Sequence, residues 1–350
     1  MTDSNPGSGH TVPLPASMVQ RAREFRGTPA PERPAATVVL LRPEGEAFQL
    51  YVVKRAATMV FGGLYAFPGG GVDPSDRPET IRTDWADRLG VPDEQARAVV
   101  GAAARELFEE AGVLLAGPVD EPDRTVSDGC LTGVVTHARQ PADDEPVSGK
   151  TTGKATDRGP ISGKTAGEAT DRGPVSGETA GGDYRDVSGE TARGVSGETG
   201  GGDYRGVSGD VSAADWEADR AAVAARALSM TDLLRRRGLR LRDDLLFPWA
   251  RWITPEFEPR RFDTWFFVAL LPEGQTARDV SGESEVATWV RPAAADGLAM
   301  LPPTRSIVNA ISAYGKMAEV IAAASRRDAA TPVMPRVEIT EDGSALLHIP

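Results

Sequence analysis

The chain is poor in the residues that build disulfides, zinc sites and histidine-centred catalytic sites. Its 350 residues include one cysteine, Cys130, and three histidines, His10, His137 and His348. A single cysteine forms neither an intramolecular disulfide nor a cysteine-based metal site. The histidines are scattered along the chain, so a Ser-His-Asp triad and a histidine-rich zinc site are poor explanations of any activity.

Long apolar runs are also missing. No run approaches the length of a membrane span, and the first 17 residues lack the basic and apolar regions of a signal peptide. The formal net charge is -12 and the pI is about 4.9, so the chain repels nucleic acid and anionic membranes. We expect a cytoplasmic protein without either partner; the sequence leaves its oligomeric state open. An anionic small molecule is compatible with this charge where a metal cation intervenes.

Glycine and proline are plentiful, with 38 and 27 residues, and two regions have a composition that does not favour a compact fold. Residues 1–32 are predicted to be a flexible tail. Residues 117–214 contain imperfect copies of one unit, such as VSGKTTGKATDRGP and VSGETAGGDYRD. Each copy offers one Val or Ile among Gly, Thr and charged residues, too little apolar surface to offset chain entropy. We therefore expect a disordered insertion.

The other segments mix strand and helix signals without a regular βαβ alternation, which indicates an α+β fold. Residues 33–116 and 215–326 are predicted to form two parts of one domain, followed by a C-terminal extension over 327–350. AATVVLL and FQLYVVKR, separated by a turn, indicate a hairpin. LLFPWARWITP, RRFDTWFFVALLP and EVATWVRP favour strands, and RVEITEDGSALLHIP a terminal hairpin. Single helices are expected over Trp216–Arg237 and Thr304–Arg327.

One predicted helix carries an unusual group of charges. It begins near Asp93, after Pro92, and ends at Gly112. Glu106, Glu109 and Glu110 share one face of it, because positions i, i+3 and i+4 are neighbours. Arg105 can pair with Glu109, but one arginine cannot neutralise three carboxylates. A hard cation such as Mg²⁺ could; the alternative from spacing alone is an ordinary solvated helix face.

The surrounding residues form a known pattern. RELFEEAGV, from Arg105 to Val113, matches the second half of the Nudix signature at every specified position, and FPGGG upstream supplies its glycine loop. The chain therefore resembles the Nudix hydrolases. The resemblance implies a Nudix-type α/β/α sandwich with a mixed sheet, interrupted by the long insertion, and a hydrolase that uses Mg²⁺ or Mn²⁺.

The chain departs from the signature at one place. The family has a glutamate six positions after the first glycine; here, counting from Gly70, that position holds Asp76. Residues 77–104 then separate Asp76 from Arg105, where the signature has seven residues. An inserted signature of this kind is similar to that of the coenzyme A diphosphatase-like branch. A glycine-and-arginine motif for coenzyme A in some Nudix enzymes is absent, because Met59 stands where the arginine would be.

The resemblance assigns roles to individual residues. It implies that Glu106, Glu109 and Glu110 bind metal, with Glu109 and Glu110 catalytic, and that Arg105 orients the glutamates. It implies that Gly69, Gly70 and Gly71 form the loop at which substrate and helix approach closely. Gly112 would end the helix in the left-handed conformation.

Other candidates come from outside the signature. Nudix enzymes often use a further carboxylate from a distant loop, and SGESEVATWV offers Glu285 in preference to Glu283. Arg260 and Arg261 precede a predicted strand, and Arg261 is a candidate for phosphate binding, with a solvated edge as the alternative. The aromatic residues of the strand-like runs are expected to be core rather than a base-stacking surface. They are Trp249, Trp252, Trp265, Phe266 and Phe267.

The expected function is hydrolysis of a phosphoanhydride in a nucleoside diphosphate linked to another group. Coenzyme A or acyl-coenzyme A is the first expected substrate, and a dinucleotide such as NADH, ADP-ribose or a nucleotide sugar is the second. A rival interpretation is a non-catalytic Nudix-fold module that binds a nucleotide, and a third makes the repeat segment a tether for partners. The complete Arg-Glu-Glu-Glu set favours the enzyme.

Overall fold

The computed structural model describes residues 10–14, 16–57, 62–121, 123–127, 130–135, 211–282, 284–341 and 343–350. They belong to one folded unit that joins Met1–His137 with Gly202–Pro350. Most of the predicted disordered insertion, residues 136–210, lies outside the described residues, as do Met59 and Glu283.

A mixed sheet forms the centre of the fold, with the strand order β12-β3-β2-β11-β10-β13. The strands are β2 (Glu32–Glu44), β3 (Ala47–Arg55), β10 (Leu246–Ile253), β11 (Arg261–Leu270), β12 (Ser284–Val290) and β13 (Pro332–Val333). β2 pairs antiparallel with β3 and parallel with β11. Two short strands, β4 (Tyr65–Ala66) and β5 (Gly69–Gly71), pair with β3 and β2. The predicted hairpin and the α+β class are confirmed.

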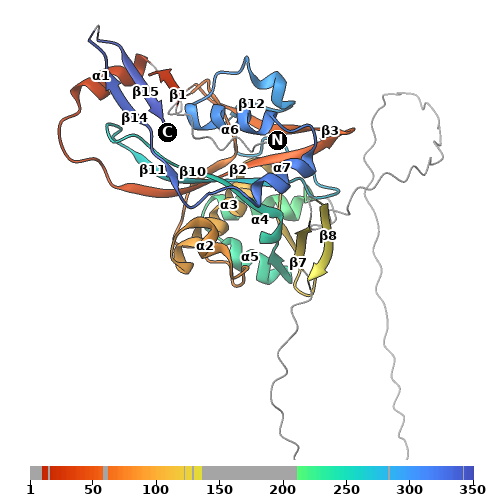
Figure 1. Ribbon diagram of the computed structural model, residues 1–350. Helices are drawn as coiled ribbons and strands as arrows, with labels where there is room; N and C mark the ends of the chain where they lie inside the picture. The colour runs from red at the N-terminus through yellow and green to blue at the C-terminus, as the bar shows by residue number, and fades with distance from the viewer. Residues whose placement is uncertain are drawn as a thin grey trace, which may run out of the picture. The chain divides into compact units, whose positions relative to one another are not determined.

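Helices cover both faces of this sheet. On one side lie α2 (Trp85–Leu89), α3 (Asp93–Ala111), α4 (Ala214–Ala224) and α5 (Met230–Arg236) (Figure 1). The other apolar core contains α6 (Pro302–Ser312) and α7 (Met317–Ala324). Short 3-10 turns occur at Asp243–Leu245 and Pro292–Ala295. The result is the α/β/α sandwich expected of a Nudix fold.

The sheet separates two cores because its side chains alternate between faces. On β2, Val38 and Leu40 pack in the core that contains α3, whereas Val39 and Leu41 pack in the core that contains α6 and α7. All four are fully buried. The continuous apolar run of this strand is therefore explained by burial on both faces.

The helix that carries the three glutamates forms as the sequence predicts. α3 begins at Asp93 with Pro92 as its N-cap, and Gly112 follows its last residue with φ of 65°. The backbone N–H of Gly112 donates to the carbonyl oxygens of Leu107 and Phe108, which completes the last turn. Glycine is favoured here because a side chain disfavours positive φ.

Two predicted long helices are each broken in two. The first is interrupted between α4 and α5, where the Ser229 hydroxyl accepts a hydrogen bond from the Asp232 backbone N–H and starts a new helix. The second is interrupted between α6 and α7, where Glu319 accepts from the backbone N–H groups of Gly315 and Lys316. Periodicity continues across both breaks, so capping contacts decide the helix ends.

The two termini pair with each other. β1 (His10–Pro13), β15 (Ala345–Ile349) and β14 (Arg336–Ile339) form a three-stranded sheet, and α1 (Ala16–Glu24) follows β1. The terminal hairpin of β14 and β15 matches the prediction. The flexible tail predicted over residues 1–32 is wrong from His10 onward, because pairing with a strand more than 330 residues away leaves no local signal.

The beginning of the predicted insertion is also structured. β6 (Ala116–Pro118) pairs with β9 (Leu239–Leu241), and β7 (Asp123–Ser127) pairs with β8 (Cys130–Val135). The first boundary of the repeat segment, placed at residue 117, is therefore too early. No helix within the described ranges is long and apolar enough to span a membrane.

Candidate active site

Two of the three clustered glutamates of α3 are buried, and the third, Glu110, is partly buried. Glu106 is 7% exposed and Glu109 9%, and the neighbouring Arg105 is 1% exposed. A solvated helix face would leave such side chains in water, so the ordinary-surface interpretation is wrong for Glu106 and Glu109. Buried charges require partners, and the partners define the site.

Arg105 uses every donor that a guanidinium has. Its Nε and one Nη2 N–H donate to the two carboxylate oxygens of Asp76 at 2.7 and 2.9 Å. The other Nη2 N–H donates to the Gly71 carbonyl oxygen at 2.8 Å. Nη1 donates to Glu106 at 2.7 Å and to Glu109 at 3.2 Å. One cation thus holds the glycine strand, Asp76 and two glutamates of α3 in fixed positions.

Asp76 is the aspartate found where the signature has glutamate. It is 2% exposed, binds Arg105 in a bidentate pair, and accepts a hydrogen bond from the Asp73 backbone N–H at 2.8 Å. The shorter carboxylate therefore still reaches the arginine, although residues 77–104 intervene.

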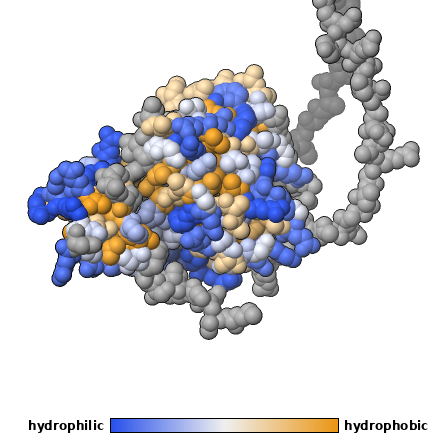
Figure 2. All heavy atoms as spheres, turned by 90° about the horizontal axis from the view of Figure 1, so that it is seen from above, coloured by the Kyte–Doolittle hydropathy of each residue, from blue (hydrophilic) through white to orange (hydrophobic). Residues whose placement is uncertain are grey.

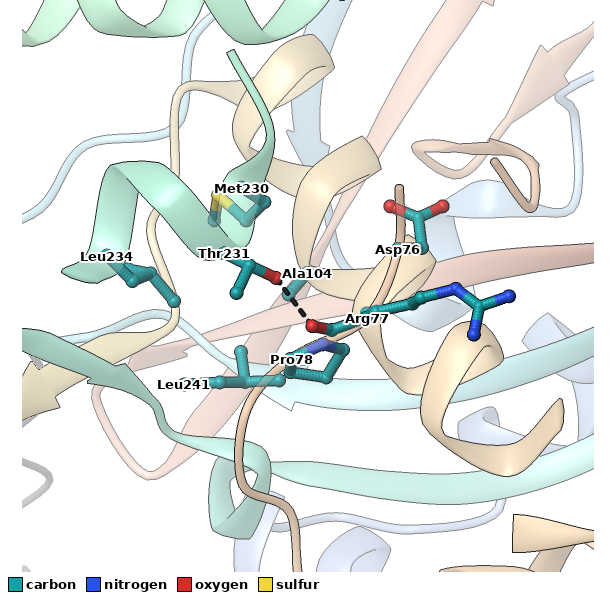
Figure 3. A pocket seen from close by; sticks show the side chains of 9 residues that line it. Asp76, Arg77, Pro78, Ala104, Met230, Thr231, Leu234 and Leu241 are labelled. Carbon is teal, nitrogen blue, oxygen red and sulfur yellow. Dashed lines mark hydrogen bonds between the residues drawn. The ribbon is translucent and has the colours of Figure 1, made fainter. Parts of the chain in front are cut away.

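The inserted residues pack against α3 and α5. The Thr231 hydroxyl donates to the Arg77 carbonyl oxygen at 2.7 Å, and Pro78 lies so close to Gly101 that an added Cβ would be 2.9 Å from its ring. Figure 3 shows the hydrogen bond between Thr231 and Arg77 among the side chains that line a small cavity. The volume of this cavity is about 10 Å³. Since this gap holds about one water molecule at most, it is a packing seam rather than a ligand site.

The glycine residues form strand β5, and they touch the glutamates directly. The Gly69 backbone N–H donates to Glu110 Oε2 at 3.0 Å. A Cβ on Gly70 would lie 2.6 Å from Glu106 Oε1, whereas a Cβ on Gly71 would meet nothing within 4 Å. Gly70 is therefore required for the close approach of β5 to α3, and Gly71 is not.

A second arginine, 117 residues after Glu109 in the sequence, contacts this glutamate. Arg226 follows α4 and donates through Nη1 to Glu109 Oε1, and its Nε lies 3.6 Å from Asp73 Oδ2. Its φ is 59°, a left-handed conformation that is costly for a residue with a Cβ. Sequence reasoning missed Arg226, because nothing in RAAVAARALS distinguishes it from a surface arginine.

Burial and charge act against each other in this cluster. Burial raises the pKa of Glu106, and the repulsion of Glu109 adds to that rise, while Arg105 and Arg226 oppose it. Burial alone would lower the pKa of Arg105, but hydrogen bonding to Asp76 and the charges of Glu106, Asp76 and Glu109 raise it overall. Arg105 therefore remains a cation at any physiological pH.

The carboxylates offer oxygen donors, the type that Mg²⁺ and Mn²⁺ prefer. In the part of the chain that the structure describes, no three acidic, histidine or cysteine side chains form a ready metal cage. Glu109 is engaged by two arginines, and Glu110 by Gly69. The donor set fits a hard divalent cation if Arg226 yields its contact with Glu109.

A large cavity adjoins the glycine strand on the side away from α3. Its volume is about 1220 Å³. It is lined by β2, β5, β11, the end of β10, the start of α6, and residues of α1 and β15. Gly70 belongs both to this lining and to the contact with Glu106. The carboxylate cluster and the cavity therefore meet at β5.

The two remaining candidates make structural contacts. Arg261 donates from Nε to Thr254 O and from Nη1 to Ala30 O, and Nη2 pairs with Glu32. It is 5% exposed, and its neighbour Arg260 lines the cavity instead. Arg261 thus ties β11 to the chain that enters β2.

Glu285 lies on β12, where it pairs with Lys54 Nζ at 2.8 Å and accepts from the Ala57 backbone N–H at 3.1 Å. The hydrogen bond and charge of Lys54 lower the pKa of Glu285. A lower pKa makes this carboxylate a weaker base.

The five aromatic residues of the strand-like runs are all buried, but two of them also line the cavity. Trp249, Trp265 and Phe267 are at most 1% exposed and belong to the core. Trp252 and Phe266 are also buried but line the cavity. The core interpretation therefore holds for the first three, whereas the other two form part of a ligand-sized space.

The fold and the site define a class of enzyme, one whose buried arginine and clustered carboxylates lie against a glycine strand. Residues 31–148 match the family model of the NUDIX domain, a range that contains β5 and the whole of α3. Over these residues the chain is similar to a NUDIX domain. No curated protein matches the sequence.

Several solved structures are similar. A NUDIX hydrolase from Alicyclobacillus acidocaldarius is 20% identical, with a TM-score of 0.49, covering 84% of this chain and 96% of that one. The Nudix hydrolase RenU from M. smegmatis is 12% identical, with a TM-score of 0.31, covering 83% and 87%. The NUDIX domain of Shewanella oneidensis NrtR, complexed with ADP ribose, is 9% identical, with a TM-score of 0.32, covering 85% and 95%. Such distant likenesses carry no conclusion about substrate.

Proposed function

We propose that the protein hydrolyses a phosphoanhydride in a nucleoside diphosphate linked to another group, with Mg²⁺ or Mn²⁺. The observation that supports this most is the burial of Glu106 and Glu109 against a glycine strand, beside a cavity of about 1220 Å³. A diphosphate at β5 would have carboxylates on one side and room for its organic group on the other.

Glu106, Glu109 and Glu110 would hold the metal. A bound divalent cation would neutralise phosphate charge and supply an activated water. Arg105 keeps Glu106 and Glu109 in place, a positioning role, because all its donors are used within the protein. The Gly69 backbone N–H orients Glu110.

The general base is proposed to be a carboxylate of the cluster rather than Glu285. A base must lie within hydrogen-bond reach of the attacking water and have a pKa near the working pH. The pKa of Glu106 is raised, whereas that of Glu285 is lowered by its pair with Lys54. The position of Glu110, which accepts from the Gly69 backbone N–H at β5, leads us to favour it as the base in addition to its proposed contact with the metal.

Coenzyme A or an acyl derivative is the proposed substrate, and ADP-ribose, NADH or a nucleotide sugar is the second candidate. The inserted signature supports the first. The apolar lining contributed by Leu14, Met18, Trp252, Phe266 and Leu347 also suits a long organic group better than a bare sugar.

A substrate panel tests this proposal. The purified protein is incubated with Mg²⁺ or Mn²⁺ and coenzyme A, acetyl-coenzyme A, NADH, ADP-ribose or UDP-glucose, and products are separated by anion exchange. We expect the highest kcat/KM for a coenzyme A compound. A kcat/KM at least ten times higher for ADP-ribose would replace coenzyme A by the second candidate.

A further inference from the structure

The large cavity lies between the central sheet and the terminal elements of the chain. β2 contributes Ala35 and Thr37 to its floor, and α1 and β15 contribute Met18 and Leu347 to its wall. Figure 2 looks onto the side that carries α6 and the terminal strands, where hydrophobic side chains gather among hydrophilic ones. The lining is mostly apolar, so the few charged groups in it determine which ligands it accepts.

Most arginines around the cavity and the carboxylate cluster are already neutralised. Arg21 pairs with Glu258 at 2.9 Å, Arg226 pairs with Glu109 and Asp73, and Arg261 is held by Thr254, Ala30 and Glu32. These side chains stabilise the protein itself. None of the three has its guanidinium free for a ligand without first losing a contact.

Arg55 is different. It is the last residue of β3, it lines the cavity together with Gly69, Gly70 and Gly71, and its side chain is half-buried. Its Nε is shielded from solvent and has no hydrogen-bond partner among the described residues. Its backbone, by contrast, is fully paired, with N–H to Leu64 O and its carbonyl oxygen to Gly63 N–H.

A buried guanidinium donor without a partner is costly. Native proteins satisfy most buried polar atoms, and an exception calls for an explanation such as a functional role, a bound ion or a water molecule. Of the residues with such atoms in the described part of the chain, which also include Tyr51, Arg82 and Trp249, Arg55 is the one that lines the cavity. The planar guanidinium fork matches phosphate oxygens and binds them through paired hydrogen bonds. An anion that enters the cavity lined by Arg55 and β5 would offer the guanidinium the acceptor oxygens that the described residues do not supply.

We propose that Arg55 binds a phosphate group of the substrate on the cavity side of the glycine strand. This inference rests on the proposed function, because it places the diphosphate of the same substrate between Arg55 and the glutamates of α3. The apolar part of the cavity then holds the organic group. Arg260 also lines the cavity and has no partner in the described part of the chain. It is exposed, so water can solvate its guanidinium, and it therefore does not need an anion as Arg55 does.

Binding and stability together distinguish this role from a structural one. The probes are ADP without metal, in EDTA, and Mn²⁺ alone, each measured by isothermal titration calorimetry. We expect Arg55→Met to weaken ADP binding at least tenfold, to change Mn²⁺ affinity less than twofold, and to leave the metal-free Tm unchanged or higher. Arg55→Lys keeps the positive charge but loses the planar guanidinium, and we expect its ADP affinity to lie between those of the wild type and Arg55→Met. Arg326→Met, which removes one exposed charge elsewhere, should match the wild type in all three measurements.

Each opposite outcome overturns the proposal. Unchanged ADP binding by Arg55→Met, or no ADP binding by the wild type, contradicts a phosphate role. A marked fall in Tm or failure to fold for Arg55→Met, with normal ADP binding by Arg55→Lys, makes Arg55 structural. The proposed function is tested separately. If Arg55→Met turns over the substrate with an unchanged KM, the role of Arg55 is contradicted and the proposed function stands. If ADP binding depends on Arg55 but no substrate is turned over, the proposed function is contradicted and the role of Arg55 stands.

Discussion

Arg105 and Asp76 form a buried bidentate ion pair although 28 residues, 77–104, separate them in the sequence. Both side chains are at most 2% exposed. The pair joins the loop after β5 to α3, and it places the glycine strand against the glutamates. Asp76 thus binds Arg105 through both carboxylate oxygens although its side chain is shorter than that of the glutamate in the signature.

Asp76→Asn should destabilise the protein. Asparagine has one acceptor oxygen, so it cannot accept from both Nε and Nη2 of Arg105, and a buried donor that loses its partner costs about 1–3 kcal/mol, although Glu106 and Glu109 still neutralise the guanidinium. Urea unfolding monitored by circular dichroism measures the change. Glu94→Gln is the control, because Glu94 forms an exposed pair with Arg77, and such pairs contribute about 0–1 kcal/mol. Equal effects of the two substitutions would contradict the role given to Asp76.

Arg226→Asn should increase affinity for the metal. The guanidinium of Arg226 contacts Glu109 and competes with a cation for it, while asparagine is neutral and tolerates the left-handed backbone that Arg226 adopts. Because Arg226 is partly exposed, the contact is worth about 1 kcal/mol, or roughly fivefold in affinity. Titration with Mn²⁺ alone measures it, with Arg226→Lys as the variant that retains the charge. Weaker Mn²⁺ binding by Arg226→Asn would show that Arg226 supports the site.

Gly70→Ala and Gly71→Ala should differ sharply, although the residues are adjacent. The new methyl group at Gly70 would lie 2.6 Å from Glu106 Oε1, and that at Gly71 would meet nothing within 4 Å. We expect Gly70→Ala to lose about 1–3 kcal/mol of stability from overpacking, and Gly71→Ala to lose less than half as much. Thermal unfolding of both variants in EDTA makes the comparison. Similar losses would mean that β5 and α3 do not pack as described.

Glu106→Gln should stabilise the metal-free protein at neutral pH. The folded protein raises the pKa of Glu106 above its ordinary value of 4.5, so the folded state holds this proton more tightly than the unfolded state. The stabilisation from protonation is complete below pH 4.5 and is lost as the pH rises through the raised pKa. The gain from glutamine should therefore grow from pH 4.5 towards neutrality. A gain that is independent of pH, or a loss at pH 7, would contradict the account of Glu106.

Local sequence patterns predicted the strands, turns and helix ends that are determined by neighbouring residues. The hairpin of β2 and β3 follows from two β-branched runs around a turn, and the end of α3 follows from Gly112. The Arg-Glu-Glu-Glu pattern lies on consecutive turns of one helix, so its spacing alone places the three carboxylates together. Their burial, which separates a site from a solvated surface, required the structure.

Long-range contacts explain what the sequence could not predict. Arg226 reaches Glu109 from a position 117 residues later, and Arg261 is consumed by contacts with Ala30 and Glu32 at the start of β2. His10–Pro13 becomes a strand only because β15 lies beside it. In each case the deciding partner is brought close by the fold, and no pattern near the residue reveals it.

The most direct test of the account is turnover by Glu109→Gln and Glu110→Gln beside the wild type, with Mn²⁺ and with EDTA, on the best substrate of the panel. We expect the wild type to be active only with metal and each variant to lose at least a hundredfold in kcat, while circular dichroism shows an intact fold. Equal turnover by the wild type and both variants, or activity that survives EDTA, would contradict a metal-dependent hydrolase built on these glutamates.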